Sequence, residues 1–169
     1  QDLISNRPAF APGASTELRA QRNLQRRVVL QKGNLVGNVR TNTAGVSARV
    51  YKNGLYGFAS AAELSDTAVQ RALSKATYNA AFLDQRIGLN KGPLPGLQQG
   101  TMPRDKDMVD VPQKTYIDFI QAVDAHIAQK YPHLVSRRVA ATADSMEKAL
   151  ATSDGYAGHI ISPRSYIYV

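Results

Sequence analysis

Three histidines carry all the imidazole chemistry that this chain can offer. His126 and His133 stand seven positions apart with Pro132 between them, so they lack the i, i+4 spacing that places two metal ligands on one helix face. His159 follows Gly158 in a predicted strand, where we expect a histidine of the strand face. Because the chain contains no cysteine, thiolate catalysis, disulfides and zinc sites with sulfur ligands are excluded. We therefore expect no metal ligands in this chain.

The motifs of nucleophilic catalysis and of phosphate binding are absent from the sequence. No Gly-x-Ser-x-Gly elbow occurs, and the glycines that recur every four residues from position 88 to 100 lack the lysine and hydroxyl of a phosphate-binding loop. Three aspartates cluster nearby without the glycine bend and terminal glutamate of a calcium loop: Asp105, Asp107 and Asp110. The sequence thus predicts no catalytic and no cofactor-binding residue, and it favours a binding or structural module over an enzyme.

The formal charge of +8 is concentrated in one segment. Between Glu17 and Lys52, eight basic residues accompany a single acid. The eight are Arg19, Arg22, Arg26, Arg27, Lys32, Arg40, Arg49 and Lys52. A basic sheet face can bind phosphates, but no aromatic residue interleaves with these side chains before Tyr51, so a platform for base stacking is missing. We expect a solvated face or a surface for a protein partner, and nucleic-acid binding through segment 17–52 is the alternative.

The length and composition are typical of one globular domain, with 169 residues of which 43% are hydrophobic and 20% charged. Residues 1–14 contain Pro8, Pro12 and Gly13 without any period, so we expect an irregular leader there and a single domain over 15–169. No apolar run approaches the roughly 18 residues of a membrane helix, so no membrane partner is expected. We expect a cytoplasmic location, although a chain that begins at Gln1 leaves room for a removed export signal.

Alternating polarity predicts three antiparallel strands in the first third of the chain. Alternation begins at residue 15 and continues to about residue 30, and the Lys-Gly-Asn sequence at 32–34 predicts a turn. A second alternating run covers 35–51. The Asn-Gly pair at 53–54 then predicts a type I′ hairpin into a third strand at 55–60, because that turn needs positive φ at both central positions.

Two helices follow, separated by a long loop. Ser65 or Asp66 is the predicted N-cap of a helix that continues to about residue 85, with apolar residues at three- and four-residue steps. Glycines and prolines interrupt any period over 88–112, which predicts an irregular loop. A second helix is predicted from about residue 113, and Pro132 ends it.

The C-terminal part again predicts strands. Alternation over 135–142 is interrupted at Asp144 and Ser145, resumes over 146–152, and passes through a turn at 154–155 into a last strand over 156–169. The predicted element order is therefore βββ-α-loop-α-βββ. This order indicates an α+β fold in which antiparallel β-meanders pack against two helices, and it leaves open whether the strands form one sheet or two.

The central hairpin resembles the signature hairpin of the TldD/PmbA family, whose members are also called modulator of DNA gyrase proteins. The residues that carry this resemblance are Gly45, Arg49, Gly54, Gly57 and Phe58. Further similarities follow in the family's order: Glu17-Leu18-Arg19, the helix after Leu64-Ser65, the helix around Val123-Asp124, Thr152-Ser153-Asp154-Gly155 and Pro163-Arg164-Ser165-Tyr166. Together these segments span nearly the whole chain from about residue 16.

The resemblance implies that this chain is the N-terminal α+β domain of a longer protein. In the TldD-type subunit of that family, the C-terminal domain carries a zinc-binding HExxxH motif and peptidase activity, and a paired PmbA (TldE) subunit completes the protease. That protease cleaves unfolded or leader peptides in extended form. No such motif occurs in this chain, so the resemblance implies a non-catalytic domain that contributes to dimer assembly and to the peptide-binding cleft.

The family name also implies a link to DNA gyrase. Whether the parent protein is of the TldD type or of the PmbA (TldE) type stays open. The Ser-Pro-Arg sequence at 162–164 leans toward the TldD type. A zinc ion is implied for the C-terminal domain of a TldD-type parent, and no cofactor is expected in this chain.

Overall fold

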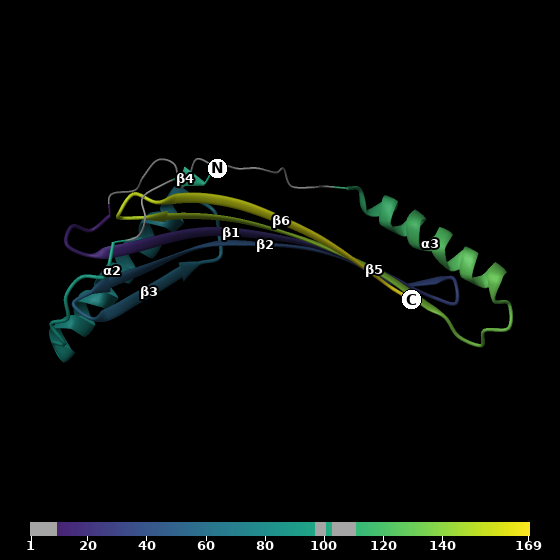
Figure 1. The fold of residues 1–169 in the computed structure, drawn as a ribbon, viewed down its shortest axis with the longest axis horizontal. Coiled ribbons are helices and arrows are strands. Elements are labelled where there is room, and N and C mark those ends of the chain that lie inside the picture. The colour runs from purple at the N-terminus through teal and green to yellow at the C-terminus, as the bar shows by residue number, and fades with distance from the viewer. Residues whose placement is uncertain (1–9, 97–100, 103–110) are drawn as a thin grey trace. The chain divides into compact units, whose positions relative to one another are not determined.

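The fold comes from a computed structural model, which describes residues 10–96, 101–102 and 111–169. Its elements are β1 (Ser15–Gln31), β2 (Asn34–Lys52), β3 (Leu55–Ala61), α2 (Asp66–Ile87), β4 (Thr101–Met102), α3 (Gln113–Lys130), β5 (Arg138–Thr152) and β6 (Ala157–Tyr168). The strands form one sheet in the order β3-β2-β1-β5-β6-β4, in which the short β4 runs parallel to β6 (Figure 1). The predicted α+β class with antiparallel strands and two helices is confirmed.

The chain divides into two compact units. Unit 1 comprises residues 1–22, 43–106 and 147–161, and unit 2 comprises residues 23–42, 107–146 and 162–169. Strands β1, β2, β5 and β6 contribute to both units, whereas β3 and α2 belong to unit 1 and α3 belongs to unit 2. Each unit has its own hydrophobic core. The single domain expected over 15–169 stays a prediction, and residues 1–9 of the expected leader lie outside the described residues.

Two tight turns connect the first three strands as the sequence predicts. Lys32 and Gly33, between β1 and β2, have φ values of 51° and 82°. Asn53 and Gly54, between β2 and β3, have φ values of 50° and 98°. Positive φ at both central positions is the type I′ requirement, and it matches the twist of the strands that the turn joins. The hairpins therefore follow directly from the local sequence.

The core of unit 1 lies between α2 and one face of the strands. Alternate residues of β2 point into it, and small residues of α2 allow the helix to approach the sheet closely. The buried residues are Leu18, Val46, Ala48, Val50, Ala59, Ala68, Val69, Ala72, Leu73, Ala76, Ala80 and Ala151. The apolar side predicted for this helix thus faces the sheet.

Both ends of α2 are capped by the residues that the sequence provides there. The Ser65 side chain accepts a hydrogen bond from the Ala68 backbone N–H at 3.1 Å, which confirms Ser65 as the N-cap. Gly88 ends the helix with a φ of 59°, and its N–H donates to the Asp84 carbonyl at 2.9 Å. The cap at residue 88 also marks the start of the predicted loop.

The core of unit 2 is formed by β1, β5 and α3. Val28 and Leu30 of β1 meet Val139 and Ala141 of β5, and Ile120 of α3 covers them. The spacing of two within each strand places these residues on one face of the sheet. Tyr116, Ile117, Val123 and Ile127 extend the contact along α3 at helical spacing.

The break predicted at Asp144 and Ser145 does not exist, because β5 continues from Arg138 to Thr152. Two strands, β5 and β6, therefore follow α3 where the sequence predicted three. The Asp144 carboxylate accepts hydrogen bonds from the Arg164 guanidinium at 3.2 and 2.8 Å, so this turn-forming residue is paired across to β6. Ser145 is buried at 6% exposure inside the strand. Tertiary pairing thus overrides a local preference for a turn.

None of the described helices is long and apolar enough to cross a membrane.

Candidate functional site

Glycines bring the signature hairpin into direct contact with its neighbours. A Cβ atom on Gly57 of β3 would lie 2.0 Å from the Ala76 carbonyl oxygen and 2.4 Å from the Ala80 nitrogen of α2. A Cβ atom on Gly45 of β2 would lie 2.6 Å from the carbonyl oxygen of Ala61. Real Cβ atoms do not approach other atoms so closely, so both positions require glycine. These two signature residues, together with the turn glycine Gly54, position the hairpin.

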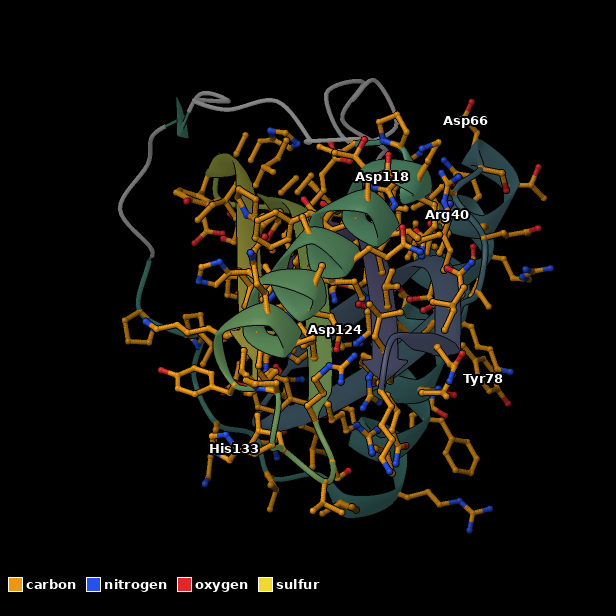
Figure 2. All side chains as sticks on the ribbon, turned by 90° about the vertical axis from the view of Figure 1, so that its right-hand side faces the viewer. Arg40, Asp66, Tyr78, Asp118, Asp124 and His133 are labelled. Atoms are coloured by element: carbon orange, nitrogen blue, oxygen red, sulfur yellow. The ribbon has the colours of Figure 1, made fainter. Side chains whose placement is uncertain are left out.

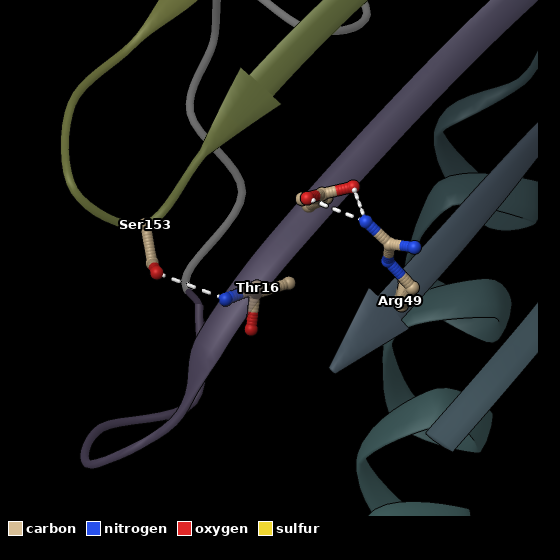
Figure 3. A network of polar contacts seen from close by, with 4 residues as sticks. Thr16, Arg49 and Ser153 are labelled. Carbon is tan, nitrogen blue, oxygen red and sulfur yellow. Dashed lines mark hydrogen bonds and ion pairs between the residues drawn. The ribbon is translucent and has the colours of Figure 1, made fainter. Parts of the chain in front are cut away.

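Arg49 lies on the face of the hairpin that points away from α2. Its neighbours in β2 are buried in the core, and the strand register places Arg49 directly opposite Phe58. The Arg49 Nη2 donates to both carboxylate oxygens of Glu17 in β1, at 2.8 and 2.9 Å (Figure 3). The guanidinium also lies 5.4 Å from the centre of the Tyr56 ring. Three strands therefore hold this one side chain in place.

The ion pair with Glu17 further favours the charged form of Arg49. The hydrogen bond from the guanidinium to Glu17 raises the pKa of Arg49 above its ordinary value. Both side chains remain partly open to solvent, with 53% of Arg49 and 32% of Glu17 exposed. Since exposed pairs contribute little to folding, the pair chiefly fixes the orientation of a permanent cation.

Two aromatic side chains complete an exposed surface around Arg49. Tyr56 is 48% exposed and Phe58 is 58% exposed. We call Glu17, Arg49, Tyr56 and Phe58 the hairpin face. Arginine and aromatic residues are enriched in protein interfaces, where they contribute a large share of the binding energy. The face is therefore suited to contact with another protein surface.

The outer edge of β3 is partly covered beside this face. The Asn79 side chain of α2 donates from Nδ2 to the Phe58 carbonyl oxygen at 3.0 Å. β3 is the last strand in the order of the sheet, so none of the described strands adjoins its outward backbone groups. The bond from Asn79 occupies one of the acceptors that an added strand would need.

A cavity of about 600 Å³ opens at the turn end of the hairpin, within unit 1. The Lys91 N–H donates to the Asn53 carbonyl at 3.1 Å, and the Tyr51 hydroxyl donates to the Gly92 carbonyl at 2.8 Å. The Tyr51 ring also contacts Tyr56 edge-on at 5.1 Å, which connects the cavity to the hairpin face. Its volume is typical of ligand pockets. Residues 10–15, 51–53, 91–94, 96 and 153–154 line it.

The turn between β5 and β6 closes the other side of this cavity. The Thr16 N–H donates to the Ser153 Oγ at 2.9 Å (Figure 3). The Ser153 N–H donates in return to the Thr16 carbonyl at 2.9 Å. Ser153 belongs to the Thr-Ser-Asp-Gly sequence on which the family resemblance partly rests. This motif therefore joins the start of β1 to the end of β5.

The predicted basic residues are distributed over both units. Unit 1 contains Arg19, Arg22, Arg49 and Lys52, and unit 2 contains Arg26, Arg27, Lys32 and Arg40. Lys52 lies 3.7 Å from the Asp84 carboxylate. Arg26 is only 5% exposed, and its guanidinium lies over the Tyr116 ring at 5.9 Å. At least three of the eight cations, Arg26, Arg49 and Lys52, thus have partners within the protein, and a patch formed by all eight stays a prediction.

The three histidines differ in exposure and in their contacts. His126 and His133 are exposed (Figure 2 labels His133), whereas His159 is mostly buried and its Nε2 lies 2.9 Å from a Glu147 carboxylate oxygen. Within residues 10–96, 101–102 and 111–169, no three His, Cys, Asp or Glu side chains meet as metal ligands. The described residues therefore do not fit a zinc ion. The aspartates Asp105, Asp107 and Asp110 lie outside the described residues.

An ion pair in unit 2 was not predicted from the sequence. Asp124 of α3 accepts from Arg137 Nε at 2.8 Å and from Nη2 at 2.9 Å, and its side chain is only 5% exposed (Figure 2). A Cβ atom on Gly33 would lie 3.5 Å from this carboxylate, and the Lys32 N–H donates to the Arg137 carbonyl at 3.0 Å. The pair therefore ties α3 to the turn between β1 and β2, a structural role for the aspartate of the family-like helix.

Residues 16–80 match the family model of the PmbA/TldA metallopeptidase domain 1. The resemblance to the TldD/PmbA family is confirmed. The matched segment contains β1, β2, β3 and most of α2, and thus the whole hairpin face. No curated protein matches this sequence.

Solved structures share the fold over most of the chain. A protein named as a modulator of DNA gyrase from Thermotoga maritima has a TM-score of 0.64 and 13% identity, over 92% of this chain and 35% of its own. TldE from Thermococcus kodakarensis has a TM-score of 0.66 and 11% identity, over 90% of this chain and 35% of its own. A protein named as a modulator of DNA gyrase from Bacteroides thetaiotaomicron has a TM-score of 0.63 and 14% identity, over 90% of this chain and 36% of its own. The chain thus spans about a third of the length of these proteins.

The structure gives the predicted signature residues partners that the sequence did not reveal. Glu17 was noted as the single acid of the basic segment, and that isolation was the available signal for its pairing with Arg49. The bond from Tyr51 to the loop at Gly92 had no local signal, because it joins residues 41 positions apart.

Proposed function

We propose that this chain is the non-catalytic first domain of a TldD/PmbA-type metallopeptidase, and that its hairpin face contributes to the contact with a paired subunit beside the peptide-binding cleft. The observation that carries the proposal is the match of residues 16–80 to domain 1 of that metallopeptidase family. The coverage of about a third of the compared structures supports a role as one domain of a larger assembly.

The geometry of the hairpin favours docking on its face over pairing along its edge. Phe58 and Tyr56 present exposed rings beside the fixed Arg49 cation, which is the residue composition of interface hot spots. An extended peptide that added to β3 would compete with Asn79 for the Phe58 carbonyl. We therefore assign the hairpin face to the contact with the partner subunit. We assign the adjoining cavity, at Tyr51, to the peptide side of the cleft.

The peptidase chemistry itself belongs, in this proposal, to a domain outside the chain. A TldD-type parent would supply zinc-activated water through an HExxxH motif there. The residues of this chain would orient and enclose the peptide, and a functional link to DNA gyrase is the alternative role that the family name suggests.

The proposal is tested first by the gene and by activity. We expect an open reading frame that continues beyond residue 169 and encodes HExxxH in a TldD-type parent. The 169-residue chain with added zinc should not cleave casein. Casein cleavage that persisted through successive purification steps would contradict the non-catalytic assignment.

The role of the hairpin face is tested in the parent protein. Arg49→Glu combined with Phe58→Ala should weaken subunit pairing in analytical ultracentrifugation by about tenfold or more. The control is Phe119→Ala, which removes an exposed ring of α3 that is 47% accessible. Pairing unchanged by the hairpin variant would remove this face from the interface.

A further inference from the structure

The solvent side of α2 carries a row of cations and aromatic rings that the proposed function does not use. Its members are Arg71, Lys75, Tyr78, Phe82 and Arg86, which we call the cation–aromatic stripe. Steps of three and four residues place them on one side of the helix over about 22 Å. All five are exposed, with Tyr78 at 66% and Phe82 at 41%, and Figure 2 shows Tyr78 pointing away from the helix.

The stripe is ordered by contacts among its own members. The rings of Tyr78 and Phe82 stack with centres 6.2 Å apart and an angle of 22° between their planes. The Arg86 guanidinium lies 4.8 Å from the centre of the Phe82 ring, and Arg71 pairs with Glu63 at 3.0 Å. Long side chains that are already ordered lose less conformational entropy when a partner binds.

The aromatic rings are not part of the helix's packing against the sheet. The buried side of α2 consists of small and aliphatic residues, including Ala72, Ala76 and Ala80. Tyr78 and Phe82 lie on the opposite, exposed side of the helix. Because this side does not pack in the core, the fold requires no apolar residue there. Large exposed rings of this kind are typical of interaction surfaces.

We propose that the cation–aromatic stripe is a docking surface for an acidic protein segment that combines carboxylates with aliphatic side chains. The stripe holds three cations, of which Arg71 pairs with Glu63, and the whole chain carries a charge of +8, so charge complementarity selects an acidic partner. Arg86, which contacts the Phe82 ring, can bind a carboxylate through two hydrogen bonds, and Lys75 adds a second positive charge. The rings of Tyr78 and Phe82 offer apolar area between these cations.

Other anionic partners fit the stripe less well. Single-stranded nucleic acid binds by stacking bases on free ring faces, and here the rings already stack on each other and under Arg86. A membrane surface requires a continuous apolar side to insert, and the aliphatic side of α2 is buried against the sheet. The stripe also lies on the other side of the hairpin from the hairpin face, so this inference does not depend on the proposed function.

A labelled acidic peptide tests the proposal. The probe is a fluorescein-labelled peptide with two repeats of Glu-Leu-Glu-Glu-Leu-Glu-Glu, and its anisotropy is measured against the 169-residue chain at about 100 mM salt. We expect saturable binding, weakened about tenfold or more by Lys75→Glu with Arg86→Glu and by Tyr78→Ala with Phe82→Ala. The matched control on α3, Lys130→Glu with Phe119→Ala, should leave binding unchanged. Circular dichroism checks that every variant is folded.

Three results would overturn the proposal. The first would be that the peptide does not bind the unaltered chain. The second would be that it binds both stripe variants as tightly as the unaltered chain. Alternatively, an oligothymidine or phosphatidylserine vesicles bind more tightly than the peptide and lose that binding in the stripe variants, which would reassign the surface to nucleic acid or to membrane. An Arg49→Glu variant should bind the probe normally, so failure of the hairpin proposal and failure of this one are distinguishable.

Discussion

Gly57 illustrates how a single residue without a side chain sets the distance between two elements. The Ala76 carbonyl lies 2.0 Å from the place where a Cβ atom would be, so the helix backbone occupies the space of the missing side chain. Backbone atoms cannot move aside in the way that the end of a flexible side chain can. The close approach of α2 to β3 therefore depends on glycine at this position.

We predict that Gly57→Ala lowers the free energy of unfolding by about 3 kcal/mol or more, because the added methyl group forces α2 away from β3. Urea denaturation followed by circular dichroism measures this change. Gly92→Ala is the matched control, since no atom lies within 4 Å of its added methyl group, and its effect should stay within about 0.5 kcal/mol. Equal effects in the two variants would contradict the steric account.

Arg49→Gln should have a small effect on stability that does not vary with pH. The pair with Glu17 is exposed, so its loss should cost less than about 1 kcal/mol. Because the pKa of Arg49 is raised, its contribution is fully present below the ordinary arginine value and is lost only as the pH rises through the higher folded value. Denaturation from neutral pH to about pH 10 should show a constant difference, and a difference that grows or shrinks in this range would be inconsistent with it.

At the scale of the elements, α2 shows how far local sequence signals determine a structure. The Ser65 cap and the apolar side of the helix were predicted from the sequence, because each depends on residues within one or two turns. The stripe on the opposite side was not predicted, although its residues follow the same helical spacing. Its exposure became evident only once the core had been located.

Ser65→Ala should destabilise the protein by about 1 kcal/mol, because it leaves the Ala68 N–H without its acceptor. Ser74→Ala, at an exposed interior position of the same helix, should be neutral or slightly stabilising. Thermal unfolding of both variants provides the comparison. The assignment of the cap fails if Ser65→Ala melts no earlier than Ser74→Ala.

The helix α3 depends on a contact that local signals do not reveal. Arg137→Ala leaves the Asp124 carboxylate, 5% exposed, without its partner, and we expect a loss of about 3 kcal/mol. The double variant Asp124→Ala with Arg137→Ala should lose less than the sum of the two single variants, as a double-mutant cycle in denaturant will measure. Additive losses would mean that the two side chains act independently.

Strand boundaries in the C-terminal part of the chain depend on distant residues and cannot be predicted from local sequence. Asp144 is a turn former by its local preference, yet Arg164 pairs with it from β6 and the strand continues. Nothing within a few residues of Asp144 signals a partner 20 positions away. Similarly, β4 lies within a glycine- and proline-rich segment and owes its existence to pairing with Ala157 and Gly158 of β6.

At the scale of the whole molecule, net charge alone does not predict nucleic-acid binding. We expect no measurable affinity for duplex DNA at about 50 mM salt, because several cations of segment 17–52 already have partners and the eight divide between two units. A duplex titration at two salt concentrations tests this. Binding that falls steeply with salt would support the nucleic-acid alternative.

The α+β class and the family resemblance could be predicted because both depend on alternation, turn glycines and a short signature. The hairpin face and the cavity could not, since they are assembled from β1, β2, β3 and the loop at 91–94. Their geometry depends on which strands become neighbours, and polarity patterns do not encode the order of strands in a sheet.

The order of strands also determines when this protein can fold during its synthesis. β1 leaves the ribosome before β5, which is its neighbour on one side, and the bond between Thr16 and Ser153 joins residues 137 positions apart. Until β5 emerges, the nascent chain exposes that side of β1 to other chains. Such long-range closure slows folding, because the entropy of closing the loop is lost before the contacts between β1 and β5 form.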